Sequence, residues 1–181
     1  MYSRVDIIKA VKRGKIYIEN FSESNLQPNS YKLHLDDEFA IPKKGKVEPH
    51  KTSDYTDFYD KKNSNVFVFK PGTFILARSE EKLALSKYVG AFVNGRTTLA
   101  RLGISVTQTA PIIQSGHGVP KPRKIIFEMF NAGPFEVTLR SSMVISEICF
   151  YELDTPTNKL YDSYGPYGVR PNKDDLLPVK D

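Results

Sequence analysis

Apolar side chains near the start of the chain follow the spacing of an α-helix. Between residues 3 and 13 they recur at Val5, Ile8 and Val11, three positions apart, which predicts an amphipathic helix over this range. Ser3 stands where such a helix needs a capping hydroxyl. We therefore expect the fold to begin with a short capped helix.

After this helix the chain shows the two-residue alternation of β-strands. In "NSYKLHL" the residues Tyr31, Leu33 and Leu35 fall on one face. Further apolar segments of strand length are "NVFVFKPG", "TFILAR", "RKIIFEMFN" and "FEVTLRSSMVISEICFYEL". Twelve prolines and eleven glycines punctuate the chain, as turns do between the strands of sandwiches and barrels. The sequence predicts a mainly all-β fold.

Two segments break the alternation. Residues 43 to 65 are polar and poor in aliphatic side chains, which predicts a long excursion on the surface. Residues 154 to 181 are rich in Gly, Pro, Tyr and charge, which predicts an extended tail that is ordered only where it docks. Because no repeat or linker divides the rest, we expect one domain over residues 1 to 153, followed by this tail.

The composition of the 181-residue chain is that of a globular protein, with 40% apolar and 26% charged residues. No run of 18 apolar residues is present, so no membrane association is expected. A single cysteine, Cys149, excludes a disulfide within one chain, and the N-terminus lacks the apolar core of a signal peptide. Both features predict a cytoplasmic protein.

The positive charge of the chain points to anionic partners. Its formal net charge is +5 and its pI is about 9.1. The lysines are scattered through segments such as "KRGK", "PKKGK" and "KPRK", whereas a nucleic-acid-binding surface would concentrate them along one face. We therefore favour a small phosphorylated ligand over nucleic acid.

The segment "GRTTLARLG", residues 95 to 103, gathers two hydroxyls and two guanidinium groups around a short apolar step. One interpretation is a glycine-flanked turn followed by a surface helix. The other is an anion cradle, in which hydroxyls, backbone N–H groups and arginines converge on a phosphate. The segment by itself does not decide between the two.

A second polar group stands out in the strand "RKIIFEMFN". Alternation places Glu128 between two large apolar residues, Ile126 and Phe130, on the face opposite Ile125 and Phe127. A carboxylate among apolar groups is costly to bury unless it is paired or protonated, which suits a group that takes up and returns protons. The same pattern fits an outward-facing glutamate on a strand edge, so both interpretations stay open.

The histidines offer little other chemistry. They stand at His34, His50 and His117, isolated from one another and from the cysteine, and no metal-ligand spacing is present. We expect no zinc site. Only His117, in "SGHGVPKP", is a candidate base for a hydrolase of the Ser-His-Asp type, and no glycine motif of the Walker or dinucleotide type occurs.

Three segments together resemble a known family. "GRTTLARLGISVTQTA", "IIFEMFNAGPFEVTL" and "MVISEICF" are similar to the corresponding segments of the dCTP deaminase branch of the dUTPase superfamily. That family typically reads Gly-Arg-Ser-Ser-Leu-Ala-Arg-Leu-Gly, then Thr-Ala, then a strand ending in Leu-Glu. The resemblance runs from about residue 3 to residue 153 and includes "LQPNSYKLHL", where the barrel of these proteins begins.

The resemblance implies a distorted jelly-roll β-barrel of the dUTPase-like type, with an N-terminal helix and short additional helices. It implies a homotrimer with active sites at the subunit interfaces and a C-terminal tail that closes over them. It also implies hydrolysis of dCTP to dUTP and ammonia, without zinc and with Mg²⁺ bound through the triphosphate of the deoxycytidine nucleotide.

The same resemblance assigns roles to individual positions. Glu128 would be the general base, and Arg101 would hold it and help to position the water. The remaining positions would bind the substrate, with the phosphates at Arg96, Thr97 and Thr98, the pyrimidine at the main chain of Ala110, Ile126 and Phe127, the sugar at Gln114, and a tail contact at Tyr164.

Three departures from the family pattern bear on specificity. Gln114 stands where the family has an aspartate that contacts the deoxyribose and, in dUTPases, activates water, so cleavage of dUTP to dUMP is disfavoured. "HGVPKPRK", between His117 and the strand of Glu128, inserts about four residues. The tail keeps Tyr164 but has Ser163 where the family has a lysine, and it lacks the family's glutamine.

Two further interpretations therefore stay open. One is a related nucleotide hydrolase of altered specificity, such as a dUTPase-like pyrophosphatase or a bifunctional deaminase. The other is a non-catalytic nucleotide-binding homologue. Retention of both Arg101 and Glu128 argues against the second, because a protein that only binds has no need of a half-buried base.

Overall fold

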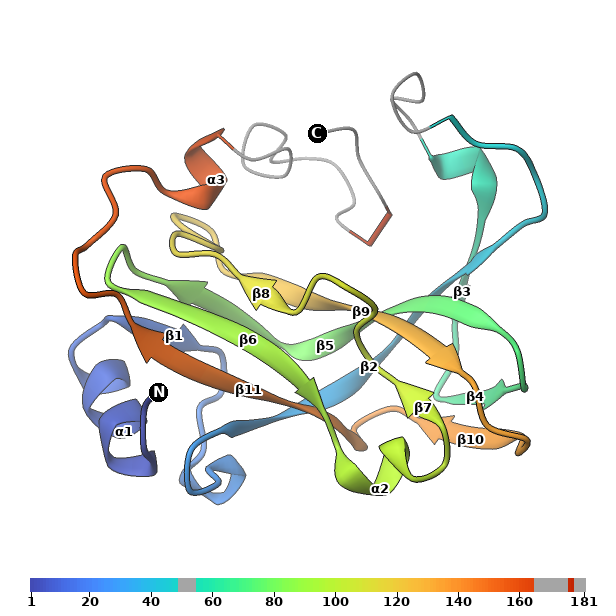
Figure 1. Cartoon of the computed structure of the whole chain (residues 1–181), viewed down its shortest axis with the longest axis horizontal. Helices are drawn as coiled ribbons and strands as arrows, with labels where there is room; N and C mark the ends of the chain where they lie inside the picture. Colours follow the sequence, from blue (N-terminus) through green and yellow to red (C-terminus); the bar gives the residue numbers. More distant parts are fainter. Residues whose placement is uncertain (49–54, 165–175, 178–181) are drawn as a thin grey trace.

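The computed structural model describes residues 1–48, 55–164 and 176–177 of the chain (Figure 1). Its helices are α1 (Arg4–Lys12), α2 (Thr97–Ala100) and α3 (Tyr161–Tyr164), with short 3-10 helices η1 (Glu23–Asn25) and η2 (Thr56–Phe58). Its strands are β1 (Ile16–Ile18), β2 (Tyr31–Pro42), β3 (Tyr59–Asn63), β4 (Val66–Phe69), β5 (Phe74–Leu85), β6 (Val89–Gly95), β7 (Ile104–Ser105), β8 (Ile112–Ile113), β9 (Arg123–Asn131), β10 (Val137–Arg140) and β11 (Val144–Glu152).

Nine of these strands form one antiparallel sheet that curls around the core (Figure 1). They run in the order β7-β9-β5-β2-β11-β6-β8, with β1 added on β5 and β3 on β2, while β4 and β10 form a separate pair. Tyr31, Phe127 and Phe150 are among the fully buried side chains that the sheet encloses. The predicted fold class, a mainly β distorted jelly-roll barrel, is confirmed. Within the described residues, no helix has both the length and the apolar character needed to cross a bilayer.

Helix α1 begins where the sequence predicts, because Ser3 and Asp6 form a reciprocal capping box. The Ser3 hydroxyl accepts a hydrogen bond from the Asp6 backbone N–H, and the Asp6 carboxylate accepts one from the Ser3 backbone N–H. The buried side chains of α1 are Ile7 and Ala10, whereas Val5 is 56% exposed. Val5 and Ile7 lie about 200° apart around a helix, so the prediction of Val5 as part of the core face was wrong.

Strand β3 lies inside the segment predicted as a polar excursion. It pairs with Glu38–Pro42 of β2, and all its residues except Tyr59 are exposed. Because it has no apolar face to bury, its sequence shows no alternation. The described part of the excursion does lie on the surface, but β3 adds a strand to the sheet there. Residues 49–54, which include His50, lie outside the described residues.

Strand β9 buries one face and leaves the other partly open, as the alternation predicts. Ile125, Phe127 and Met129 are at most 1% exposed, whereas Glu128 points to the opposite face and is half-buried. Glu128 pairs across the sheet with Leu76 of β5, and β7 runs along the other side of β9. Glu128 therefore lies on a strand that has neighbours on both sides.

A second apolar cluster lies on the outer face of the sheet. Ala40 of β2 and Leu76 of β5 pack there with Leu176 and Leu177, and Ile126 of β9 packs against them. The two leucines belong to the tail. Leu76 pairs across the sheet with Glu128, so the two side chains lie on the same face. The tail therefore docks on the sheet face that carries Glu128.

Two glycines bring the end of "GRTTLARLG" against the turn that follows β9. Gly103 has a φ of +82°, and a Cβ there would lie 2.5 Å from the backbone nitrogen of Gly133. The Ala132 N–H donates to the carbonyl of Gly103 at 2.9 Å, so the two backbones are in direct contact. Glycine is required at position 103 both for its conformation and for this close approach.

We expect Gly103→Ala to lower the free energy of unfolding by about 3 kcal/mol or more, because a left-handed alanine is combined with an overlap of backbone atoms. Gly72→Ala is the matched control, since Gly72 has a φ of +70° but no atom within 4 Å of the position that a Cβ would take. The control should lose only about 1–2 kcal/mol. Urea unfolding followed by circular dichroism measures both, and equal losses would contradict the close approach.

Candidate active site

The segment "GRTTLARLG" links the end of β6 to β7. Thr97–Ala100 form the single turn of α2, and Leu99 is buried in the main core and anchors that turn. Thr97, Thr98 and Arg101 are exposed. The turn and the surface helix of the first interpretation are both present. The same short stretch of surface also exposes the hydroxyl and guanidinium groups that the anion-cradle interpretation requires.

Arg96 is held by a carboxylate of its own chain. Its Nη1 donates to Glu147 Oε1 at 2.9 Å, and the other carboxylate oxygen of Glu147 accepts from the Ser30 hydroxyl at 2.7 Å. Glu147 lies on β11, so the pair joins the predicted phosphate-binding segment to a strand of the sheet. A guanidinium group has five N–H donors, so this pair leaves donors of Arg96 for an anion.

Glu128 is held at three points by the segment that follows β7. Its backbone N–H donates to the carbonyl of Val106 at 3.0 Å, and its own carbonyl accepts from Gln108 Nε2 at 3.0 Å. Its carboxylate Oε2 accepts from the backbone N–H of Gln108 at 3.2 Å. Sequence analysis did not find Gln108, because an amide in an exposed loop carries no signal; only the pairing of β7 with β9 brings it to Glu128.

Arg101 and Glu128 form no hydrogen bond or ion pair with each other in the described part of this single chain. Arg101 follows α2 and its side chain is exposed, whereas Glu128 is half-buried on β9. The pairing of these two residues therefore stays a prediction.

The predicted pyrimidine-binding residues flank Glu128. Ile126 is half-buried and Phe127 is fully buried, and the prediction uses main-chain atoms at both positions. Ala110 is exposed in the loop that joins β7 to β8, the two ends of the strand order. Because the same loop contains Gln108, the structure brings Ala110 into the segment that contacts Glu128.

Gln114 and Tyr164 lie farther along the chain. Gln114 directly follows β8 and is exposed, and its carbonyl accepts from the His117 N–H at 3.1 Å. Tyr164 is the last residue of α3, and its side chain lies outside the described part of the chain. Residues 165–175, which contain the rest of the altered tail motif, lie outside it as well.

The loop before β9 is packed against the start of the tail. The Asp162 carboxylate of α3 accepts from Arg123 Nε at 3.0 Å and from the Gly118 N–H at 2.8 Å. Asp162 and His117 are both buried. These contacts fix the start of the tail on the barrel beside this loop.

His117 is buried as a neutral imidazole. Burial lowers the pKa of His117 to about 3, and the positive charge of Arg123 acts in the same direction. Its Nε2 has no hydrogen-bond partner among the described residues. A buried histidine that resists protonation is poorly suited to the role of catalytic base in a Ser-His-Asp hydrolase.

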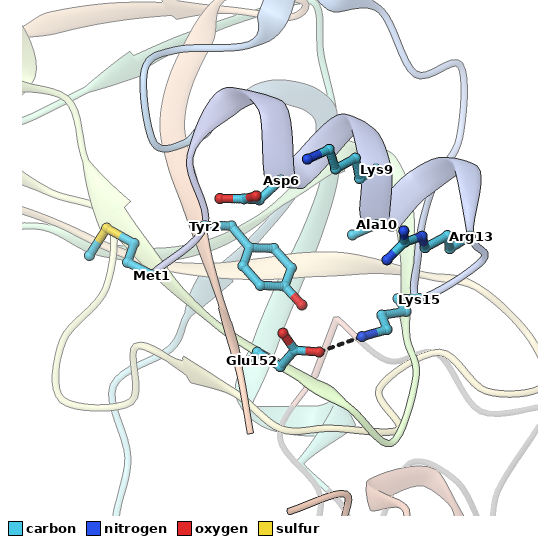
Figure 2. A pocket seen from close by; sticks show the side chains of 8 residues that line it. All are labelled: Met1, Tyr2, Asp6, Lys9, Ala10, Arg13, Lys15 and Glu152. Carbon is cyan, nitrogen blue, oxygen red and sulfur yellow. Dashed lines mark hydrogen bonds and ion pairs between the residues drawn. The ribbon is translucent and has the colours of Figure 1, made fainter. Parts of the chain in front are cut away.

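Two clefts within the described residues are lined by other side chains. One, of about 390 Å³, lies beside α1 and contains Tyr2 and the ion pair of Lys15 with Glu152 (Figure 2). The other, of about 360 Å³, contains the pair of His34 and Glu81. Neither cleft is lined by any of the predicted site residues.

Among the described residues, one group of potential ligand side chains is compact enough to hold a metal ion, namely Asp36, Asp37 and Glu38 of β2. Asp36 is paired with Lys124 and Glu38 with an arginine of β5, so two of the three carboxylates already have cationic partners. All three are oxygen donors, whereas zinc sites are built mainly from nitrogen and sulfur. We assign no metal to this group.

The curled sheet, the turn with its hydroxyl and guanidinium groups, and the glutamate on the adjoining strand define a β-barrel of the dUTPase-like class. The family described as dCTP deaminase-like matches residues 1–153. The chain belongs to this family of enzymes.

Relatives and a solved structure agree with this membership. A protein of Methanosphaerula palustris named "dCTP deaminase, dUMP-forming" is 32% identical over 147 residues, which are 80% of this chain and 77% of the relative. The dCTP deaminase of Haloarcula marismortui is 30% identical over 167 residues, 88% of this chain and 84% of that one. The crystal structure of 2'-deoxycytidine 5'-triphosphate deaminase from Agrobacterium tumefaciens has a TM-score of 0.63 at 19% identity, over 82% of this chain and 46% of its own. The chain thus spans about half of that structure, and the likeness shows the fold.

The low pKa of His117 predicts how stability depends on pH. Between the ordinary value of 6.5 and about 3, the unfolded chain binds a proton at His117 that the folded chain does not. Stability should therefore fall as the solution is acidified through this range, by up to about 1.4 kcal/mol per pH unit. His117→Gln should remove this part of the dependence. Urea unfolding at pH 7 and pH 4.5 compares the two chains, and parallel losses would contradict a neutral buried histidine.

Proposed function

We propose that the chain is a deaminase that hydrolyses dCTP to dUTP and ammonia without zinc. The observation that carries the proposal is Glu128, a half-buried carboxylate held by the segment directly after "GRTTLARLG". Membership of the dCTP deaminase-like family supports the same reaction. The cytosine ring would lie between Glu128 and the loop that contains Ala110.

Glu128 is the general base of this reaction. Its carboxylate takes a proton from water while the water oxygen forms a bond to C4 of cytosine and the electrons of the C4–N3 double bond move to N3. The protonated Glu128 then gives that proton to the 4-amino nitrogen. The electron pair on N3 re-forms the double bond as ammonia leaves, and the hydroxyl product is a tautomer of uracil.

The phosphates bind at the exposed turn of α2. Thr97 and Thr98 offer hydroxyl groups there, and Arg96 offers the N–H donors that its pair with Glu147 leaves. These hydrogen-bond donors suit phosphate oxygens. Mg²⁺ would be held by the triphosphate itself and would reduce the repulsion among its oxygens. The Gln114 amide would bind the sugar hydroxyl.

The active sites lie between the subunits of a homotrimer. The support is that Arg101 is exposed and forms no pair with Glu128 in the described part of one chain. A neighbouring subunit would supply the guanidinium that faces Glu128. The tail would close over the site, which is supported by the docking of Leu176 and Leu177 on the sheet face of Glu128, and Tyr164 would reach the nucleotide from the end of α3.

A second candidate function is formation of dUMP, in which the same site also cleaves pyrophosphate from the nucleotide. It is favoured by the names of two related proteins, from Methanosphaerula palustris and from a Nocardioides species, which are both called dUMP-forming. Gln114 stands against it, because an amide cannot act as the base that activates water for phosphate cleavage. We therefore favour dUTP as the product.

We expect Glu128→Gln to lower kcat for dCTP by about 10³-fold, because glutamine keeps the shape of the side chain but cannot take up a proton. A coupled ammonia assay measures the rate, and ion-exchange chromatography separates dUTP from dUMP. Glu136→Gln, a change of an exposed glutamate directly before β10, should leave the rate unchanged. Pyrophosphate release would favour the second candidate, and a native chain that leaves dCTP unchanged would overturn the proposal.

Mixed trimers test whether the site is shared between subunits. Glu128→Gln chains and Arg101→Ala chains should each be almost inactive alone. Trimers assembled from both should recover activity, because Glu128 of one chain then meets Arg101 of the other. One site in each mixed trimer is intact, so recovery should reach at most about a third of the native rate.

The control for this experiment is each variant taken through the same unfolding and reassembly by itself. Light scattering after size-exclusion chromatography verifies that the mixed material is trimeric. If mixed trimers are as inactive as their parents, Glu128 and Arg101 act from the same chain, and the shared site is refuted.

A further inference from the structure

We propose that Gln108 is a positioning residue that fixes the carboxylate of Glu128 for catalysis, an inference that rests on the proposed role of Glu128 as the base. Gln108 is an exposed residue of the loop between β7 and β8. The family resemblance assigned it no role, and its importance follows only from its contacts.

Gln108 contacts Glu128 through both its main chain and its side chain. The Gln108 backbone N–H donates to Glu128 Oε2 at 3.2 Å, and Gln108 Nε2 donates to the Glu128 carbonyl at 3.0 Å. Nε2 also donates to the Ser105 hydroxyl at 2.8 Å, so both hydrogens of the amide group are engaged. The side chain thereby ties the loop to β9 at the residue whose carboxylate the backbone N–H holds.

The position of this loop continues the ladder between two strands. Ser105 of β7 pairs with Phe130 of β9, and the Glu128 N–H donates to the Val106 carbonyl at 3.0 Å. The amide of Gln108 extends that ladder past the end of β7. Without it, the loop would be attached to β9 only up to Val106, and the N–H that meets the carboxylate would be free to move.

The two carboxylate oxygens of Glu128 consequently differ. Oε2 is held by Gln108, whereas Oε1 has no hydrogen-bond partner among the described residues. Oε1 is therefore the oxygen that takes the proton from water.

Gln108→Leu tests this inference, because it removes both amide donors and keeps the backbone N–H. We expect kcat to fall about tenfold through loss of alignment, with KM changed less than about threefold. Ser105→Ala removes one of the two anchors and should give a smaller change in the same direction.

Gln27→Leu is the matched control, since Gln27 lies in the loop before β2 and its Nε2 contacts only the Leu26 carbonyl. It should leave both kcat and KM unchanged. If Gln108→Leu behaves like this control, the positioning role is refuted. An increase in KM with kcat unchanged would refute it too, because Gln108 would then be a substrate contact.

A direct spectroscopic measurement separates this inference from the proposed function. The carboxyl carbon of Glu128 can be followed by ¹³C NMR and assigned by its loss in Glu128→Gln. At pH 7 its chemical shift should change in Gln108→Leu and stay the same in Gln27→Leu, whether or not the chain turns over dCTP, because only the first substitution alters the contacts of Glu128. An unchanged signal overturns the role of Gln108 in holding the carboxylate. An inactive native chain whose signal does change overturns the proposed function and leaves only the contact between the two residues.

Discussion

The pleat of β9 fixes where Glu128 can point, and the candidate site is arranged around that direction. Burying Ile125, Phe127 and Met129 in the core sends the intervening side chains to the opposite face of the sheet. A slip of one residue in the pairing with β5 would exchange the two faces and place the carboxylate in the core. The core thus sets the direction of Glu128, because burying the three apolar side chains of β9 contributes more free energy than the placement of one carboxylate.

Segments that are far apart in the chain meet on the outer face of this strand. The loop after β7 contacts Glu128 through Gln108, and the tail covers the neighbouring Leu76 with Leu176 and Leu177. The start of the tail is fixed separately, through the Asp162 carboxylate. Half-burial of the glutamate is therefore produced by several elements together, and no single one of them builds its surroundings.

Several charged side chains of this protein are paired within their own chain. Arg96 is paired with Glu147, and Asp36 with Lys124. Arg101 differs, because it is exposed beside α2 and forms no pair with Glu128 in the described residues. In a symmetric assembly, an exposed cation beside the exposed hydroxyl groups of α2 can reach the site of a neighbouring subunit. The proposed shared site would use Arg101 in this way.

The sequence by itself determined the helix cap at Ser3, the alternation of β9, and the motif that placed the chain in its family, because each depends on neighbours within a few residues. It could not reveal β3, which buries no apolar face, or the contact of Gln108 with Glu128. Those features depend on pairing between segments that are distant along the chain. The residues next to a polar side chain in the sequence do not indicate which distant segment it will contact. Only the tertiary structure decides which exposed amide lies against the carboxylate.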